Sequence, residues 1–330
     1  MIIKPCSTTG VGSLPFKKVT QAIEHVFARY EIPFLPQLPK QHLHEQMLYQ
    51  FLEDFPGFTK VGNRLFIDLD HFKPQNLPSQ VFSFSFLSAL EPFCQKSKKA
   101  PLIKLQVTSP YTMASHLFCS DQKLVLDHPP VYEYLKEFIL YKTKVLLQKF
   151  PQPKLLFFDE PMLSRANVDQ VLPMLEGFIR SLTAFGMTGT LGMTGQCLFG
   201  LHSCNLWSSF LFQKIFLSSF DIISFDMKEG LDALLEEPEA LFSFLKKGWL
   251  MWGVVPTSFS GELAPDFFIH SLQNKHLKKE QILTIVAKLL MSPACGTSQV
   301  SVEQEQKCAK NLKQMALYSR KFYEQEGEKP

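Results

Sequence analysis

Arginine is scarce in this chain. Only five of its 330 residues are Arg, and Lys supplies most of the 34 basic side chains. Arg is the usual bidentate partner of carboxylates and phosphates, so its scarcity argues against a substrate with several anionic groups. The 31 acidic residues nearly balance the basic ones, the formal net charge is +3, and no basic run is interleaved with aromatic side chains. We therefore expect no nucleic-acid partner.

Long apolar runs and ordered cysteine spacings are also missing. No stretch approaches the ~18 apolar residues of a membrane span. The opening Met1–Pro5 is too short and too soon interrupted for a signal peptide. The seven Cys are odd in number and irregularly spaced, which does not suit a disulfide framework. We predict a cytoplasmic protein without a membrane partner.

The sequence contains no internal repeat, low-complexity tract or Gly/Ser-rich linker. A length of 330 residues is compatible with one large domain, and 45% hydrophobic residues with 31 Phe indicate a large core. We predict a single domain over residues 1–330, with a short charged tail that frays after about residue 318.

Short apolar runs, each followed by a longer helical stretch, recur along the chain. Such runs are typical of parallel strands buried on both faces, and eight of them predict an α/β fold, the (β/α)8 or TIM barrel. Arg64–Asp70 also has the pattern of a strand. We interpret it as part of a hairpin excursion after the second strand, although it could itself be the second strand. The eight runs are Thr8–Ser13, Ile32–Gln37, Leu102–Thr108, Leu155–Asp159, Cys197–His202, Asp221–Asp226, Leu250–Pro256 and Leu289–Cys295.

Polar or small residues stand at the ends of several of these runs. In a barrel, the carboxyl ends of the strands meet at one mouth, where such proteins keep their chemistry. We therefore expect these residues to converge, although they are far apart in the sequence. They are Gly10–Ser13, Asp159 with Glu160, His202 with Cys204, Asp226 and Cys295.

Three of these side chains have the chemistry of a zinc site. Imidazole and thiolate are ligands that zinc prefers, and a catalytic zinc typically has three protein ligands and one open position. We therefore predict that His202, Cys204 and Cys295 bind Zn²⁺. Asp226 is a fourth ligand, a partner behind the ligands, or simply the cap of the following helix. An H-x-C pair alone is weak evidence, because free Cys is often just buried.

The other strand-end residues suit an amino-acid ligand. Gly10 and Gly12 let the backbone approach a ligand closely. Ser13 and the adjacent amides could hold a carboxylate, and Asp159 could pair with an ammonium group. The alternatives are that Ser13 is a turn residue and that Asp159 and Glu160 cap a helix.

Six short motifs, in this order, resemble the C-terminal domain of the cobalamin-independent methionine synthases and its single-domain relatives. That group belongs with the uroporphyrinogen decarboxylases in one barrel superfamily, and the resemblance covers about residues 7 to 300. The motifs are Thr8–Pro15, Phe158–Pro161, His202 with Cys204, Ile223–Asp226, Trp252–Thr257 and Pro293–Gly296.

The resemblance implies a zinc-dependent methyltransferase of methionine biosynthesis, similar to 5-methyltetrahydropteroyltriglutamate–homocysteine methyltransferase. The metal ligands it implies are His202, Cys204, Cys295 and Asp226, and the catalytic residues are Asp159 and Asp226. The homocysteine-binding residues it implies are Val11, Gly12, Ser13, Gln37, Asp159 and Glu160.

The chain departs from the synthases in three respects. Asp226 stands where they usually have Glu, and Gln37 stands where they carry a His-Gly-Glu segment. The one predicted barrel lacks the second, N-terminal barrel with which full-length synthases help to bind folate. The methyl donor therefore stays open among folate, a corrinoid or other methyl-carrier protein, and a small methylated thiol.

Three functions remain to be compared. The leading hypothesis is methyl transfer to a small-molecule thiol, with homocysteine as acceptor. A metal-free decarboxylase of the uroporphyrinogen type is a second, but it needs Arg side chains to bind several carboxylates. A non-catalytic barrel that binds zinc or another ligand is the third.

Overall fold

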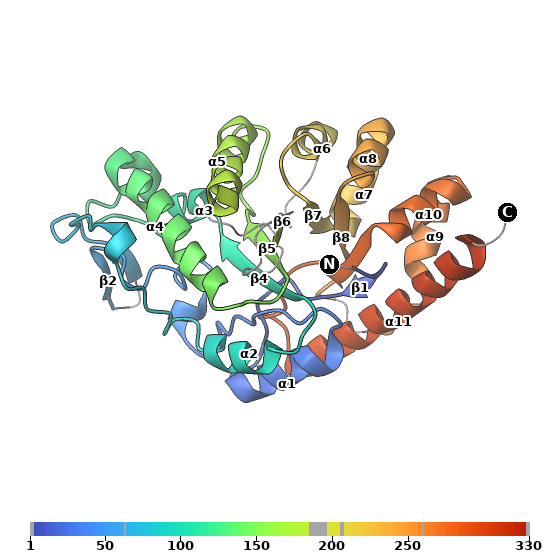
Figure 1. Ribbon diagram of the computed structural model, residues 1–330, viewed down its shortest axis with the longest axis horizontal. Coiled ribbons are helices and arrows are strands. Elements are labelled where there is room, and N and C mark those ends of the chain that lie inside the picture. Colours follow the sequence, from blue (N-terminus) through green and yellow to red (C-terminus); the bar gives the residue numbers. More distant parts are fainter. Residues whose placement is uncertain (1–2, 63, 185–196, 205–207, 259–260, 328–330) are drawn as a thin grey trace.

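The computed structural model describes residues 3–62, 64–184, 197–204, 208–258 and 261–327 (Figure 1). Within them, one curled sheet of seven strands has the order β1-β9-β8-β7-β6-β5-β4, and every neighbouring pair is parallel. The strands are β1 (Ser7–Thr8), β4 (Ile103–Thr108), β5 (Lys154–Asp159), β6 (Cys197–His202), β7 (Ile222–Asp226), β8 (Trp249–Val255) and β9 (Leu289–Pro293).

Helices surround this sheet on its outer side (Figure 1). The sheet is therefore covered by helices outside and filled by its own side chains inside, as an α/β architecture requires. The α-helices are α1 (Val19–Arg29), α2 (Leu90–Ser97), α3 (Pro110–Ala114), α4 (Pro129–Gln148), α5 (Val168–Leu182), α6 (Ser209–Phe216), α7 (Met227–Leu235), α8 (Pro238–Leu245), α9 (Phe267–Gln273), α10 (Lys279–Ala287) and α11 (Val302–Gly327). Short 3-10 turns lie at η1 (Leu43–Glu45), η2 (Leu77–Ser79) and η3 (Val125–Asp127).

The sheet strands coincide with the apolar runs of the sequence. All residues of β4 and of β5 are buried, which explains the apolar run Leu155–Phe158 of β5, whereas β4 also buries the polar side chains of Lys104 and Gln106. Aromatic contacts join the sheet to the helices, as where Phe158 of β5 meets Phe178 of α5 edge to face at 6.1 Å. The first strand is shorter than predicted: β1 ends at Thr8, and Ser13 makes only an isolated bridge.

The predicted second strand, Ile32–Gln37, is not a strand in the structure, so an eight-stranded barrel is not confirmed. The segment nevertheless runs between the two edges of the sheet. Ile32 N–H donates to the Thr8 carbonyl at 2.9 Å, and Leu35 N–H donates to the Lys104 carbonyl at 3.0 Å. Pro33 and Pro36 have no N–H group to donate, which accounts for the interrupted ladder.

The predicted hairpin excursion is present. Strands β2 (Phe58–Val61) and β3 (Arg64–Ile67) pair antiparallel and form a separate sheet, and an isolated bridge joins Ile67 to Cys119. The end of the chain differs from the expected fraying tail, because α11 continues to Gly327 and packs Phe322 and Tyr323 against the core.

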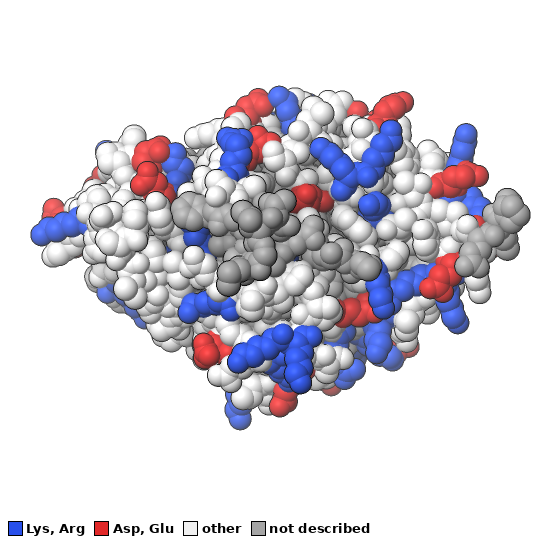
Figure 2. All heavy atoms as spheres, viewed as in Figure 1, with Lys and Arg blue, Asp and Glu red and all other residues white. Residues whose placement is uncertain are grey.

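No helix among the described residues is long and apolar enough to cross a membrane. Lys and Arg are interspersed with Asp and Glu over the face shown in Figure 2.

Candidate metal centre and substrate cavity

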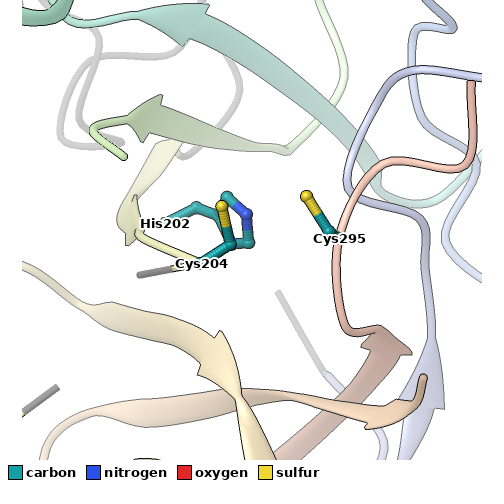
Figure 3. A group of neighbouring side chains, drawn as sticks. All are labelled: His202, Cys204 and Cys295. Carbon is teal, nitrogen blue, oxygen red and sulfur yellow. The ribbon is translucent and has the colours of Figure 1, made fainter. Parts of the chain in front are cut away.

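The structure brings His202, Cys204 and Cys295 together. His202 ends β6, Cys204 follows two residues later, and Cys295 follows β9 on the opposite side of the cluster. Their side chains point toward one another (Figure 3), and the candidate ligand atoms all lie within 4.8 Å of one another. The carboxyl ends of two strands that are not neighbours in the sheet thus deliver one nitrogen and two sulfurs to one point.

The ring of His202 is oriented by a partner on the neighbouring strand. Its Nδ1 lies 2.9 Å from the Ser224 hydroxyl oxygen, and both residues are buried. Ser224 and His202 are register partners in the β6–β7 pair, which fixes this contact. With Nδ1 engaged, Nε2 is the nitrogen available to a metal, the arrangement that metal-binding histidines use.

The thiols of Cys204 and Cys295 are hydrogen-bonded to each other. The Cys295 thiolate accepts hydrogen bonds from Cys204 and from His202, and these hold the pKa of Cys295 well below its usual range. The same contact with Cys295, together with burial, raises the pKa of Cys204. The lowered pKa of Cys295 favours its thiolate, the form that binds a metal, and metal binding would release the remaining proton. A nitrogen and two soft sulfurs with room for a further ligand fit Zn²⁺.

The cluster lies at a cavity of about 310 Å³. Four of the residues predicted to bind substrate line it together with the three candidate ligands. These four are Val11, Ser13, Gln37 and Asp159.

Asp159 presents an unpaired carboxylate oxygen to this cavity. It ends β5, is buried, and its Oδ1 has no hydrogen-bond partner among the described residues. Burial raises the pKa of Asp159 to about 6, while His202 and Lys104 act in the opposite direction. A buried carboxylate without a partner is costly, so the position suits a cationic ligand group.

Ser13 reaches the cavity beside Cys295 because Gly296 has no side chain. A Cβ atom on Gly296 would lie 2.0 Å from the Ser13 hydroxyl oxygen. Thr297 N–H donates to the Ser13 carbonyl at 2.8 Å, which joins the loop after β1 to the loop after β9. The neighbouring Gln37 is buried, and its Nε2 has no hydrogen-bond partner among the described residues.

Three predicted residues lie outside the cavity lining, namely Gly12, Glu160 and Asp226. Gly12 supports it from behind, since a Cβ atom there would lie 2.9 Å from the Gln106 amide. Glu160 accepts hydrogen bonds from the Thr112 hydroxyl of α3 at 2.5 Å and from Met162 N–H at 3.0 Å, so it joins the loop after β5 to α3.

Asp226 does not join the three-residue cluster. It is the N-cap of α7, and its Oδ1 accepts a hydrogen bond from Lys228 N–H at 2.9 Å. Of the alternatives that the sequence left open, the structure therefore has Asp226 as a helix cap.

Sequence reasoning missed Ser224 and Lys104. Lys104 is fully buried in β4, its Nζ donates to the Val11 carbonyl at 2.6 Å, and it lies 4.7 Å from the ring centre of Phe157. It thereby holds the loop that carries Ser13. A lysine inside an apolar strand, and a serine two residues before Asp226 on the same strand face, were the available signals.

No family model matches the sequence, and none of the curated proteins matches it. Several solved structures resemble the chain along nearly its whole length. A B12-independent methionine synthase from Shewanella sp. W3-18-1, solved in complex with selenomethionine, is 16% identical with a TM-score of 0.64, over 97% of this chain and 98% of that one.

Two further structures have the same fold. A methyltransferase from Methanosarcina mazei is 13% identical with a TM-score of 0.57, over 98% of this chain and 95% of that one. A Listeria monocytogenes protein, assigned as a vitamin-B12-independent methionine synthase, is 12% identical with a TM-score of 0.56, over 98% of this chain and 99% of that one. The chain thus has the fold of the cobalamin-independent methionine synthases along nearly its whole length.

Proposed function

We propose that this chain is a zinc-dependent methyltransferase that methylates the sulfur of a thiol-bearing amino acid, with homocysteine as the leading acceptor. The observation that carries the proposal is the cavity of about 310 Å³, which has His202, Cys204 and Cys295 at one end and the unpaired Asp159 carboxylate beside them. An amino-acid thiol fits this arrangement, with sulfur toward the cysteines and ammonium toward Asp159.

Each residue then has a defined task. His202, Cys204 and Cys295 would hold zinc, and a zinc ion there would lower the pKa of a bound thiol and favour the thiolate nucleophile. Asp159 binds the ammonium group, while Ser13 and the nearby backbone amides bind the carboxylate. Positioning of this kind supplies much of the rate of a transfer between two bound groups.

Lys104, Ser224 and Asp226 act behind these groups. Lys104 fixes the loop of Ser13, and Ser224 fixes the ring of His202. Asp226 caps α7, and we propose that it leaves the fourth coordination position to the thiol instead of binding zinc itself.

We also propose that residues 1–330 form one barrel closed by Ile32–Gln37. The parallel bridges from Gln37 to Ser13 and from Phe34 to Lys104 support closure, since they join this segment to both edges of the sheet. Closure would bring the end of β1, with Ser13, next to the end of β4 at the same mouth.

The competing functions fit less well. A decarboxylase acting on a polycarboxylate would need cationic side chains, and no described residue that lines the cavity is Lys or Arg. A non-catalytic binding protein would not need a metal site beside a carboxylate that binds the substrate. Measurement of turnover distinguishes a methyltransferase from such a protein.

The Asp159→Asn variant tests the substrate site. A charge-assisted hydrogen bond to an ammonium group contributes about 1.5–3 kcal/mol. We expect Asp159→Asn to weaken homocysteine binding about tenfold or more, measured calorimetrically, while zinc stays stoichiometric.

The matched control is Asp169→Asn, which removes an exposed carboxylate at the start of α5. It should leave the affinity unchanged. Equal homocysteine affinity in the Asp159→Asn variant and the unaltered protein would remove Asp159 from the site, and absence of both zinc and homocysteine binding from the unaltered protein would refute the proposed function.

A further inference from the structure

The cavity that holds the candidate metal centre is lined by acidic and neutral groups. Its described lining contains the carboxyl groups of Glu45 and Asp159 and the thiols of Cys204 and Cys295, but no Lys or Arg. Residues 185–196 and 205–207, which the structure does not describe, contain no charged residue in the sequence. A ligand that enters this cavity therefore meets negative charge.

Lys104 and Lys40 do not contribute their ammonium groups to the cavity lining. Lys104 is buried behind the cavity, and its Nζ donates to the Val11 carbonyl and to the Gln106 side chain. Lys40 is exposed, and its Nζ donates to the Val300 carbonyl at 2.6 Å, which ties together two loops of the rim. Neither lysine lines the cavity.

The carboxyl group of Glu45 also lines the cavity. The side chain is buried, with Oε1 accepting from Ser88 N–H at 2.8 Å and Oε2 from Leu38 N–H at 3.3 Å. Both hydrogen bonds come from neutral backbone groups, so neither brings a positive charge to the Glu45 carboxyl group. Asp159 is reserved for the ammonium group of the acceptor, whereas the carboxyl group of Glu45 has no partner in an amino-acid thiol.

The size of the cavity limits the second substrate. A volume of about 310 Å³ is at the lower end of the ~300–1,000 Å³ typical of small-molecule sites. The acceptor already occupies part of it. The part of the methyl donor that enters the cavity beside the acceptor must therefore be small, and the lining favours a cation over an anion.

We propose that the methyl donor is a small methylsulfonium compound, which rests on the proposed methyl transfer to a thiol. The acceptor thiolate attacks the methyl carbon from the side opposite the positively charged sulfur. A new S–CH3 bond forms as the old C–S bond breaks, and the bonding pair stays on the leaving sulfur, which departs as a neutral thioether. No proton transfer or redox step is needed.

The charges change favourably in this reaction. A cation and a thiolate become two neutral thioethers, so their attraction brings them together and a partly dry cavity does not oppose the transition state. An anionic donor would instead meet the carboxyl group of Glu45, and no described Lys or Arg of the lining would bind it. The cavity lining thus supports a cationic methyl donor.

The experiment compares donors on the zinc-loaded protein. With homocysteine as acceptor, we would offer S-methylmethionine, methyltetrahydrofolate and methylcobalamin separately and measure methionine with an isotopic label in the donated methyl group. We expect kcat/KM for S-methylmethionine to exceed that for either other donor at least tenfold.

Two lysine substitutions at the rim test the electrostatic argument. Gln46 and Gln299 line the cavity and are exposed, so Gln46→Lys with Gln299→Lys adds positive charge with little risk to folding. We expect kcat/KM for the sulfonium to fall about tenfold, with homocysteine binding and zinc content kept. Gln273→Lys, exposed on α9, adds the same type of charge away from the cavity and should change nothing.

Each result has one meaning. Faster methionine formation from methylcobalamin or methyltetrahydrofolate would overturn the donor assignment and keep the proposed function. An unchanged kcat/KM for S-methylmethionine in the variant with Gln46→Lys and Gln299→Lys would have the same meaning. No methionine from any donor, with homocysteine still bound at zinc, also overturns the assignment. Loss of zinc and homocysteine binding in the unaltered protein would refute the proposed function itself.

Discussion

Residues behind the metal ligands determine how well the ligands are placed. The hydroxyl of Ser224 is 2.9 Å from His202 Nδ1, and this contact selects Nε2 for the metal. Groups of this type are typically worth 10–100-fold in metal affinity. Ser224 is buried in β7, so its orientation is set by the sheet register and not by a loop.

Replacement of Ser224 by Ala should therefore weaken zinc binding about 10–100-fold, measured by competition with a chelator. Ser292→Ala is the matched control, because Ser292 is a buried serine of β9 whose hydroxyl has no hydrogen-bond partner among the described residues. Equal zinc affinities in the two variants would show that Ser224 does not orient His202.

Contacts between side chains on neighbouring strands could not be predicted from the sequence. His202, Cys204 and Cys295 could be predicted because each follows an apolar run and carries ligand chemistry. The pairing of His202 with Ser224 depends on strand register, which no local pattern reveals. Lys104 was missed for a similar reason, since its partner, the Val11 carbonyl, is a backbone group 93 positions away.

At the scale of elements, the β8–β9 pair places Cys295. The register of this pair shifts between Gly253 and Val255, and Ala294 N–H donates to the Val255 carbonyl at 2.9 Å. A Cβ atom on Gly253 would lie 2.4 Å from the Cα atom of Ala294, directly before Cys295. The close approach of the two backbones is possible only because residue 253 is glycine.

The Gly253→Ala variant should consequently lose both stability and metal. Overpacking of this kind costs about 1–3 kcal/mol, which urea unfolding would measure, and displacement of Ala294 should lower zinc retention. Gly177→Ala is the control, since a Cβ atom there meets only Arg180 at 3.8 Å within α5. If Gly253→Ala unfolds at the same urea concentration as the unaltered protein and keeps its zinc, the role assigned to this contact is wrong.

The elements themselves were largely predictable, with an informative exception. Buried parallel strands are mostly apolar, so the strands from β4 to β9 could be recognised in the sequence, although β4 also carries Lys104 and Gln106. Ile32–Gln37 has the same apolar character, but its prolines interrupt the hydrogen bonds that define a strand. The apolar pattern thus predicted that this segment lies between β1 and β4, but it did not predict the interrupted hydrogen bonding.

For the whole molecule, a buried lysine outside the site makes stability depend on pH. Lys142 of α4 is fully buried, its Nζ donates to the Glu53 carbonyl at 2.6 Å, and it lies 4.0 Å from an Asp54 carboxylate oxygen. Burial lowers the pKa of Lys142 from 10.5 to about 8, against the smaller opposite effects of Asp54 and Glu53. It anchors the segment before the hairpin excursion to the helix layer.

The direction of the pH effect follows from proton binding. Between pH 8 and 10.5 the unfolded chain holds the Lys142 proton and the folded chain has lost it, so the free energy of unfolding rises with pH in that window. Below pH 8 both states are protonated and the contribution is constant. Lys142→Met should remove this rise, measured by urea unfolding at a series of pH values.

Lys136→Met, a loss of positive charge on the same helix, is the matched control, because Lys136 pairs with Glu133 near the surface. The difference in unfolding free energy between the unaltered protein and Lys142→Met should grow from pH 8 to 10.5. A difference that stays constant across this range would contradict the assignment.

The central claim is that one histidine and two cysteines hold a zinc ion to which a thiol substrate binds. X-ray absorption at the zinc edge measures this most directly. We predict two sulfurs at about 2.3 Å in the zinc-loaded protein, a third sulfur when homocysteine is added, and loss of stoichiometric zinc in Cys204→Ser but not in Cys94→Ser, which alters a thiol of α2. Zinc without sulfur ligands, or a sulfur count that homocysteine does not raise, would contradict the account.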